Sequence, residues 1–349
     1  MSEPAGDSGS PLLEIKGLTV TIGSGDNELN AVRGIDLSVR RGESIGLVGE
    51  SGAGKSLSML SITSLLPRSA RVGGSVKLNG RELIGLRNKQ LRHIRGAEIG
   101  MIFQDPMTSL NPVFAVGRQV GEAIRIHNRG LSRKAVEQAS IELLASVAIP
   151  APKDRIHSYP FELSGGMRQR VMIAIAIANN PALLIADEPT TALDVTIQAQ
   201  ILELLRRLAE ERDMALVLIT HDLGVIAGMV ERVAVMYGGR IVEERSTADL
   251  FSAPLHPYTK ALLACVPRPD SPDARLTGIP GSPAVLRPAP RGCSFAPRCM
   301  DVRPDCAEID PPLEGEEGDR VACIVAAPPG SRTKGDRLQP VARAGQVTE

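Results

Sequence analysis

The sequence predicts an α/β fold with a buried parallel sheet. Three short, largely apolar runs, at residues 44–48, 182–186 and 215–219, each end in a cluster of glycine, acidic or other polar residues. Runs of this length and character are typical of parallel strands that are covered on both faces. Because parallel strands place their carboxyl ends at one edge of a sheet, we expect the polar clusters to meet there.

The first of these runs leads into a phosphate-binding loop. Residues 49–56 have the pattern G-x-x-x-x-G-K-S, and leucines then recur at helical spacing until Pro67. In such a loop, backbone N–H groups surround the α- and β-phosphates, the lysine reaches the β- and γ-phosphates, and the hydroxyl ligates Mg²⁺. A glycine-rich turn that matched by chance would lack the flanking strand and helix. The predicted nucleotide-binding residues are Gly49, Glu50, Ser51, Gly52, Ala53, Gly54, Lys55 and Ser56.

The composition argues against two other classes of protein. The chain has 349 residues, zero formal net charge and 2% aromatic residues without Trp, so we expect no binding of nucleic acid. Its longest apolar runs, such as 171–178, are far shorter than the roughly 20 residues of a membrane span. Residues 1–10 lack the layout of a signal peptide, so we expect a disordered leader on a cytosolic protein that reaches membranes only through partners.

An antiparallel β subdomain is expected beside the parallel sheet. Residues 12–22 and 31–39 alternate between apolar and polar side chains, with a turn-like segment between them. This pattern predicts a pair of antiparallel strands. Further strands are expected at 75–78 and at 99–103.

A helical subdomain is expected within the α/β core. Residues 116–148 show helical periodicity, with a break near Gly130 and an end at Pro150. We interpret them as part of a helical subdomain, at about 105–180, inserted into a domain that spans 11–250.

A second helix start with exposed backbone N–H groups is expected at residues 163–170. Ser164 is a suitable N-cap for a helix that runs to Asn179. Because Gly165 and Gly166 have no side chains, the backbone N–H groups of the first turn are exposed. A single nucleotide cannot easily contact both the phosphate loop and this helix start of the same chain. The economical arrangement is a dimer in which this helix faces the γ-phosphate held by the other subunit.

Polar residues follow the other two apolar runs. A carboxylate pair, Asp187 and Glu188, stands where Mg²⁺ and the attacking water would be held, and we assign Asp187 to the metal and Glu188 to the general base. Alternatively, the pair merely solvates a strand end. Residues 191–208, which include Asp194, are expected to form a helix. His221 arrives at the same sheet edge, although a lone histidine is more often structural.

These motifs, in this order, resemble those of the ATP-binding-cassette (ABC) ATPases over about residues 12–244. The resemblance implies a P-loop NTPase fold, the ABC nucleotide-binding domain, and ATP and Mg²⁺ as ligands. The signature at 163–167 is specific to that family. By the resemblance, Glu188, the switch histidine His221 and the Q-loop residue Gln104 are catalytic, and Ser56, Gln104 and Asp187 hold Mg²⁺.

The same resemblance implies action on the nucleotide of a partner subunit by Ser164, Gly165 and Gly166, and a D-loop at Asp194. One departure is visible. Family members usually carry an aromatic residue that stacks on adenine just before a glycine, and here Ile22 precedes Gly23. We therefore expect adenine contact to be weaker or to come from elsewhere.

A C-terminal extension, 251–325, follows the predicted ATPase domain. Residues 256–263 form a short amphipathic segment that begins His-Pro-Tyr, and we expect a packing helix with a proline start. The segment resembles the C-terminal extension of the oligopeptide/dipeptide (peptide/nickel) importer ATPases. Residues 268–290 have the composition of a linker, and 326–349 that of a disordered tail.

Four cysteines lie in this extension with the spacing C-x5-C-x6-C-x16-C. In a reducing cytosol we expect metal ligation rather than disulfides, because a small proline-rich segment gains folding energy from a bound centre. The wide gaps are unlike those of structural zinc sites, and zinc or unliganded thiols remain alternatives. Resemblance to peptide-importer ATPases that hold a [4Fe–4S] cluster favours iron–sulfur. Cys265 is expected to be a buried small hydrophobe, and the proposed ligands are Cys293, Cys299, Cys306 and Cys323.

We predict an ATP-hydrolysing subunit of an ABC importer for di- or oligopeptides, peripheral at the cytoplasmic face of the membrane. The resemblance implies a second, related ATPase subunit, two transmembrane permeases and an extracytoplasmic solute-binding protein as partners. An importer ATPase for nickel or another small solute is an alternative, because the same architecture serves it. A soluble ABC ATPase acting on ribosomes or DNA is a further alternative, but such proteins usually carry two cassettes or a long coiled-coil insertion.

Overall fold

The computed structural model describes residues 10–105, 109–191, 193–266, 278–284 and 291–326. Among the helices of these residues, none is both long and apolar enough to cross a membrane. Three segments named from the sequence therefore lie wholly or largely outside the description: all but the last residue of the leader 1–10, most of the linker 268–290, and all but the first residue of the tail 326–349.

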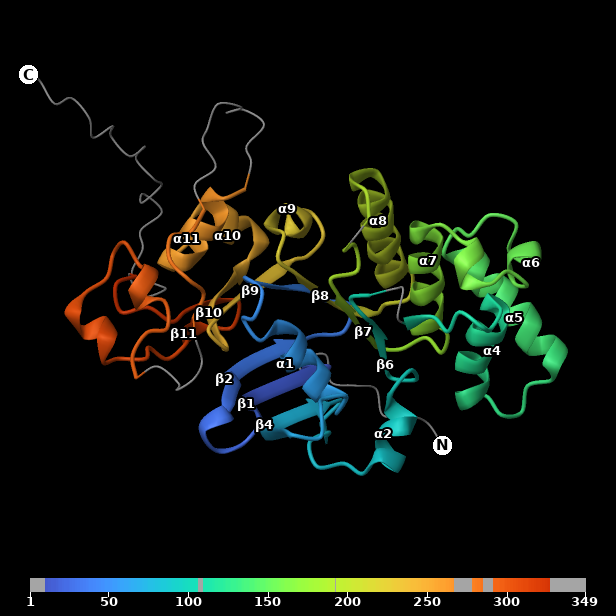
Figure 1. Cartoon of the computed structure of the whole chain (residues 1–349), viewed down its shortest axis with the longest axis horizontal. Helices are drawn as coiled ribbons and strands as arrows, with labels where there is room; N and C mark the ends of the chain where they lie inside the picture. Colours follow the sequence, from blue (N-terminus) through green and yellow to red (C-terminus); the bar gives the residue numbers. More distant parts are fainter. Residues whose placement is uncertain (1–9, 106–108, 192, 267–277, 285–290, 327–349) are drawn as a thin grey trace, which may run out of the picture.

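An eight-stranded sheet forms the centre of the molecule (Figure 1). The five strands from β9 to the edge strand β6 are parallel, as the short apolar runs predict for three of them, and β10, β12 and β11 extend the other side by antiparallel pairing. The strand order is β11 (Glu314–Glu316), β12 (Asp319–Val321), β10 (Arg240–Ser246), β9 (Arg232–Tyr237), β3 (Ser44–Val48), β8 (Ala215–Thr220), β7 (Leu183–Asp187) and β6 (Ile99–Ile102).

A second, four-stranded antiparallel sheet packs on the first. Its third strand, β4, starts at Ala70, whereas the sequence predicts a start at Ser75. Two glycines interrupt the sequence pattern of the strand, but its pairing with β1 continues past them to Ala70, which pairs with Ile22. Gly74 accommodates the close approach of β1, since a Cβ there would lie 2.4 Å from the carbonyl oxygen of Gly17. The strand order is β2 (Leu29–Val39), β1 (Leu13–Ile22), β4 (Ala70–Leu78) and β5 (Arg81–Glu82).

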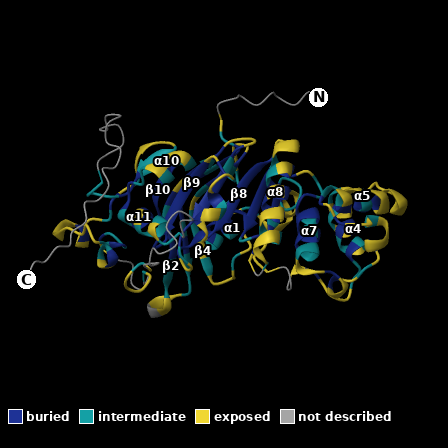
Figure 2. Cartoon of the chain, turned by 90° about the horizontal axis from the view of Figure 1, so that it is seen from above, coloured by how far each residue is buried: buried dark blue, intermediate teal, exposed yellow. Residues whose placement is uncertain are grey.

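The central strands are apolar along their whole length because both of their faces are covered. Along β8, Val217 and Ile219 pack in the core between the two sheets, whereas Leu216 and Leu218 pack in the core beneath the helices. Figure 2 shows this buried interior running along β8 and β9. The period of two that usually marks a strand is therefore hidden in the sequence.

Helices cover the parallel sheet and build one end of the molecule. The predicted break near Gly130 separates α4 from α5, and Asp194 caps α8, so this helix begins at Val195 rather than within 191–194. The helices are α1 (Lys55–Ile62), α2 (Asn88–Ile94), α4 (Val116–His127), α5 (Arg133–Ser146), α6 (Pro152–Arg155), α7 (Gly165–Ala176), α8 (Val195–Glu211), α9 (Leu223–Ile226), α10 (Thr247–Ser252) and α11 (Pro257–Ala264).

The C-terminal extension lies at the other end of the molecule from α4, α5 and α6 (Figure 1). The predicted packing helix is α11, and its proline start follows His256, whose Nδ1 accepts from the backbone N–H of Tyr258 over 3.0 Å. The short strands β11 and β12 join the extension to β10, where the buried carboxylate of Glu244 pairs with Arg232 and Arg320. The extension is thus part of the central sheet.

Candidate ATP site

The loop between β3 and α1 has the backbone that its glycines permit. Gly49 has a φ of 152°, and a Cβ there would lie 2.2 Å from the carbonyl oxygen of Met236. Gly54, with a φ of 101°, caps α1, and a Cβ there would lie 2.5 Å from the carbonyl oxygen of Ala31. A side chain at either position would push the loop off the sheet edge.

The Lys55 side chain folds back onto the backbone of the phosphate loop. Its Nζ donates to the carbonyl oxygen of Gly49 over 2.7 Å and to that of Glu50 over 3.0 Å. Burial lowers the pKa of Lys55, and the negative charges of Glu188 and Asp187 oppose that shift. A cavity of about 510 Å³ opens beside this ammonium group, large enough for a nucleotide. Its lining residues are Leu29, Ala31, Ser51, Gly52, Ala53, Gly54, Lys55, Ser56, Leu57, Gln104, Glu188 and Ala284.

The hydroxyl of Ser56 and the carboxylate of Asp187 form an oxygen pair at the floor of the site. Ser56 Oγ, at the start of α1, donates to Asp187 Oδ1, at the end of β7, over 2.9 Å. Burial raises the pKa of Asp187, and the hydrogen bond from Ser56 opposes that rise. Hard oxygen ligands near bound phosphates are what Mg²⁺ requires, so this pair fits the predicted metal.

Three polar side chains converge on Glu188. Gln104 Nε2 donates to Oε2 over 2.8 Å, Thr191 Oγ1 donates to the same oxygen over 3.0 Å, and His221 Nδ1 lies 3.0 Å from Oε1. Burial alone would raise the pKa of Glu188, but its hydrogen bonds and the charge of His221 lower it. The sequence predicted three of these four residues, and Thr191 was missed because only its contact identifies it.

Glu188 also has a strained backbone. Its φ is +44°, in the left-handed region that residues with a Cβ rarely adopt. The backbone N–H of Glu188 donates to the carbonyl oxygen of Ile219 on β8 over 2.9 Å, which holds the turn at the end of β7. Such strain costs on the order of 1–3 kcal/mol and persists at sites where the surroundings fix a side chain for a task.

The helix start at Ser164 lies apart from this cavity. Ser164 Oγ accepts from the N–H of Met167 over 3.3 Å, as an N-cap does, but Ser164, Gly165 and Gly166 are not among the described residues that line the cavity. A Cβ at Gly166 would lie 2.7 Å from Ile197 Cγ2, at the start of α8. Asp194 caps α8 there and accepts from the N–H of Ile197 over 2.9 Å. The predicted trans-acting segment therefore packs against the predicted D-loop residue and the start of α8.

The cavity also has apolar lining residues from outside the loop. They are Leu29 and Ala31 of β2 and Ala284 of the C-terminal extension. Nothing in the local pattern around Ala284 identifies it as a pocket residue, because it lies 228 positions after Ser56, the last residue of the loop.

The four late cysteines surround one small cavity that His256 and Phe295 also line. Cys306 is buried, and burial raises the pKa values of Cys293 and Cys299. In the described part of the chain, however, no three His, Cys, Asp or Glu side chains come close enough to hold a metal ion. The prediction for Cys265 was wrong in one respect, since this residue is half-buried at the end of α11, where its Sγ donates to the carbonyl oxygen of Ala261.

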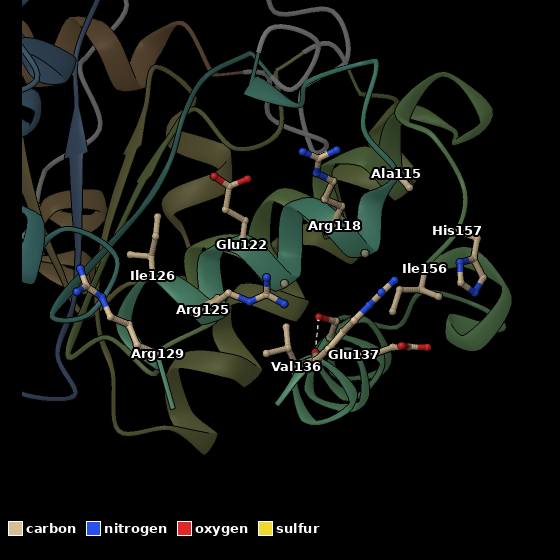
Figure 3. Close-up of a pocket in the computed structure, with 14 residues that line it drawn as sticks. Ala115, Arg118, Glu122, Arg125, Ile126, Arg129, Val136, Glu137, Ile156 and His157 are labelled. Atoms are coloured by element: carbon tan, nitrogen blue, oxygen red, sulfur yellow. Dashed lines mark hydrogen bonds between the residues drawn. The ribbon is translucent and has the colours of Figure 1, made fainter. Parts of the chain in front are cut away.

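A larger hollow, of about 830 Å³, lies among the helices α4, α5 and α6. Figure 3 shows Arg118, Glu122 and Arg125 extending from one side of α4, with Glu137 on α5 and His157 just beyond α6. The hollow carries ionisable groups of both signs and lies far from the phosphate loop, so it suits a partner chain better than a nucleotide.

Two family models match the chain. The ABC transporter model matches residues 32–191, and the model of the oligopeptide/dipeptide transporter C-terminal region matches residues 242–306. The first covers the phosphate loop, the signature helix and the carboxylate pair. The second covers α11 and three of the four clustered cysteines.

Curated relatives match over nearly the whole chain. The oligopeptide transport ATP-binding protein OppD of Salmonella typhimurium is 46% identical, over 93% of this chain and 97% of its own length. A probable peptide ABC transporter ATP-binding protein of Sinorhizobium fredii is 50% identical, over 89% and 94%. A solved dimer of the ATP-binding cassette MJ0796 with ADP and phosphate has a TM-score of 0.61 and 30% identity, over 67% of this chain and 98% of that chain.

Proposed function

The chain belongs to the ATP-binding subunits of oligopeptide ABC transporters, and from this premise we propose that it drives peptide import through partner permeases. It has the ABC ATPase fold and hydrolyses ATP. The observation that carries the proposal is that the phosphate loop and Glu188 line one cavity, with Asp187 hydrogen-bonded to the loop residue Ser56, in a chain that also has a peptide-transporter extension.

The proposed chemistry assigns one task to each group around the cavity. The loop N–H groups and Lys55 bind the phosphates, and Ser56, Asp187 and Gln104 hold Mg²⁺. When bound, Mg²⁺ would neutralise the negative charge that develops on the phosphates. Glu188 orients the attacking water and accepts its proton, and its lowered pKa keeps it ionised. His221, which contacts Glu188, is the residue that we assign to the γ-phosphate.

The second half of each site comes from another ATPase subunit in this proposal. Ser164, Gly165 and Gly166 lie on a different surface from the cavity, together with Asp194, and present a helix start with free donor groups. The related cassette MJ0796 is described as dimeric with ADP and phosphate bound. We propose that the partner is a related but different ATPase, and that ATP closes the pair.

The transporter assembly requires two permeases and an extracytoplasmic solute-binding protein, with this subunit peripheral at the cytoplasmic face of the membrane. The hollow among α4, α5 and α6 is the surface we assign to a permease, because its arginine and glutamate side chains offer ion pairs to a polar cytoplasmic segment. Closure of the ATPase pair would move these helices and the permease docked on them.

We also propose a [4Fe–4S] cluster on Cys293, Cys299, Cys306 and Cys323. The support for this proposal is the chemistry of the donor set, since all four cysteines line one small cavity. Among the described residues, no three of these side chains lie close enough together to hold a metal ion. The segment would therefore have to contract around the cluster. The cluster would supply folding energy there, as bound metals do in small domains.

Purification from detergent-solubilised membranes tests the proposed role. The tagged full chain should bring down two permeases and a second ATPase in stoichiometric amounts. The double-arginine change Arg118→Glu with Arg125→Glu should release the permeases while the chain still binds ATP. Recovery of ribosomal proteins in place of permeases would favour the soluble class of ABC ATPase and contradict the proposal.

A further inference from the structure

We propose that Arg298, in the cysteine-bearing extension, is a positioning residue of the phosphate loop that neutralises Glu50 and holds its carboxylate away from the bound phosphates. The inference rests on the proposed role of residues 49–56 as the phosphate loop. It adds to that role a contact from the other end of the chain, 248 residues away.

The Arg298 guanidinium binds Glu50 at two points. Nη1 donates to Oε2 over 2.7 Å, and Nη2 donates to Oε1 over 3.0 Å. The Arg298 side chain is 4% exposed and the Glu50 side chain 24%. Hydrogen bonding to Glu50 raises the pKa of Arg298, so the guanidinium keeps its charge and pairs with the carboxylate through two hydrogen bonds.

The extension also holds the backbone of the same loop residue. The Glu50 N–H donates to the hydroxyl oxygen of Tyr258 over 2.9 Å, and the Tyr258 side chain is fully buried. Both the main chain and the carboxylate of Glu50 are therefore held by groups of the C-terminal extension. The carboxylate is bonded to Arg298 at both oxygens, and Glu50 is not among the described residues that line the nucleotide cavity.

Arg298 is itself fixed by the extension. Its Nε donates to the carbonyl oxygen of Pro280 over 2.9 Å, and its Nη1 lies 3.3 Å from the hydroxyl of Tyr237. The Tyr237 ring lies 4.6 Å from that of Tyr258 and 5.2 Å from that of Phe295, between centroids. These contacts fix the orientation of the Arg298 guanidinium. Arg298 therefore loses little further side-chain entropy when it pairs with Glu50.

The ion pair between Arg298 and Glu50 affects nucleotide binding because Glu50 lies within the phosphate loop. A free carboxylate in a loop that binds a triphosphate would repel it in a partly water-excluded site. Arg298 cancels this charge without offering its own donors to the nucleotide. Loss of the guanidinium should therefore weaken nucleotide binding while leaving the chemistry at Glu188, which it does not touch, unchanged.

The test measures ADP binding by isothermal titration, together with KM and kcat for ATP, in the full chain with its partners. Arg298→Gln should raise the Kd for ADP and the KM for ATP about tenfold, with kcat within about twofold, and the effect should shrink at high salt. Glu50→Gln with Arg298→Gln should return both values to within about twofold of Glu50→Gln alone. Arg298→Lys, which keeps the charge, should lie within about threefold of wild type.

Two results would overturn the inference. If the double variant binds ADP as weakly as Arg298→Gln, the arginine only anchors the extension. If Arg298→Gln does not fold, a Kd for ADP that rises about tenfold in Arg298→Lys, which keeps the charge, leads to the same conclusion. Arg291→Gln, at an exposed position of the same segment, is the matched control and should change nothing. Failure of the wild-type chain to bind nucleotide would instead contradict the proposed function.

Discussion

His221 Nδ1 lies 3.0 Å from Glu188 Oε1, and this contact joins the ends of the neighbouring parallel strands β7 and β8. The other carboxylate oxygen accepts from Gln104 and Thr191. Both oxygens of Glu188 are therefore held by side chains of the same chain. A water molecule that enters the site meets a carboxylate whose position and ionisation are already set.

Glu188→Gln should lower kcat for ATP hydrolysis by at least about 100-fold, because an amide cannot accept the proton of the attacking water. The change keeps the shape of the side chain, so the Kd for ATP should stay within about threefold. Steady-state hydrolysis with equilibrium binding checks both values. Glu203→Gln, on the exposed face of α8, is the control, and normal turnover by Glu188→Gln would remove this residue from its role.

Ser56→Ala should raise the Mg²⁺ concentration for half-maximal ATP hydrolysis about tenfold. The hydroxyl that now donates to Asp187 is one of the few oxygens available to the metal, and loss of such a group typically costs 10- to 100-fold in metal affinity. Titration of activity with Mg²⁺ measures the shift. Nucleotide affinity without Mg²⁺ should not change, and an equal loss under both conditions would assign Ser56 to the loop structure alone.

Protein purified without oxygen should be brown and absorb broadly near about 400 nm if the four clustered cysteines ligate [4Fe–4S]. Cys299→Ser should remove the colour, whereas Cys265→Ser, at the half-buried position on α11, should keep it. Iron and sulfide analysis quantifies the cluster. Colourless protein that contains zinc would reverse the assignment.

Glu82 should make stability depend on pH in the acid range. Burial on its own would raise its pKa, but hydrogen bonds from the Ser75 hydroxyl and from the N–H groups of Val76, Ile84 and Leu83 lower it below the ordinary value. A group whose pKa is lowered by folding stabilises the fold above its unfolded pKa, and this contribution is lost as pH falls through the folded pKa.

The difference in unfolding free energy between wild type and Glu82→Gln should therefore be largest near about pH 7 and should narrow below about pH 4.5. Urea unfolding at both pH values measures it. A difference that is the same at both pH values would mean that Glu82 is not ionised in these hydrogen bonds.

The sequence predicted those parts of the fold whose signals are local. The phosphate loop, the carboxylate pair and the start of α7 each combine a short motif with a neighbouring apolar run, and buried parallel strands give such runs directly. The first part of β4 was missed, because Gly73 and Gly74 interrupt its alternation and only its pairing with β1 makes it a strand.

Contacts between distant segments could not be predicted. Arg320 reaches the buried Glu244 only because β12 adds to the central sheet beside β10, and Arg298 reaches Glu50 across 248 positions of the chain. Neither arginine belongs to a pattern that distinguishes it from the other basic residues of the extension. Pairing of this kind depends on the tertiary fold and leaves no local trace in the sequence.

The central claim is that one chain holds half of each reaction centre, and ATP turnover per chain across a dilution series tests it most directly. Turnover should fall as the chain is diluted to a monomer, return when the partner ATPase is added, and drop at least about 100-fold with Ser164→Arg. Ser132→Arg, which removes the equivalent N-cap of α5, should keep turnover. Full turnover by a strictly monomeric preparation, unchanged by Ser164→Arg, would contradict the claim.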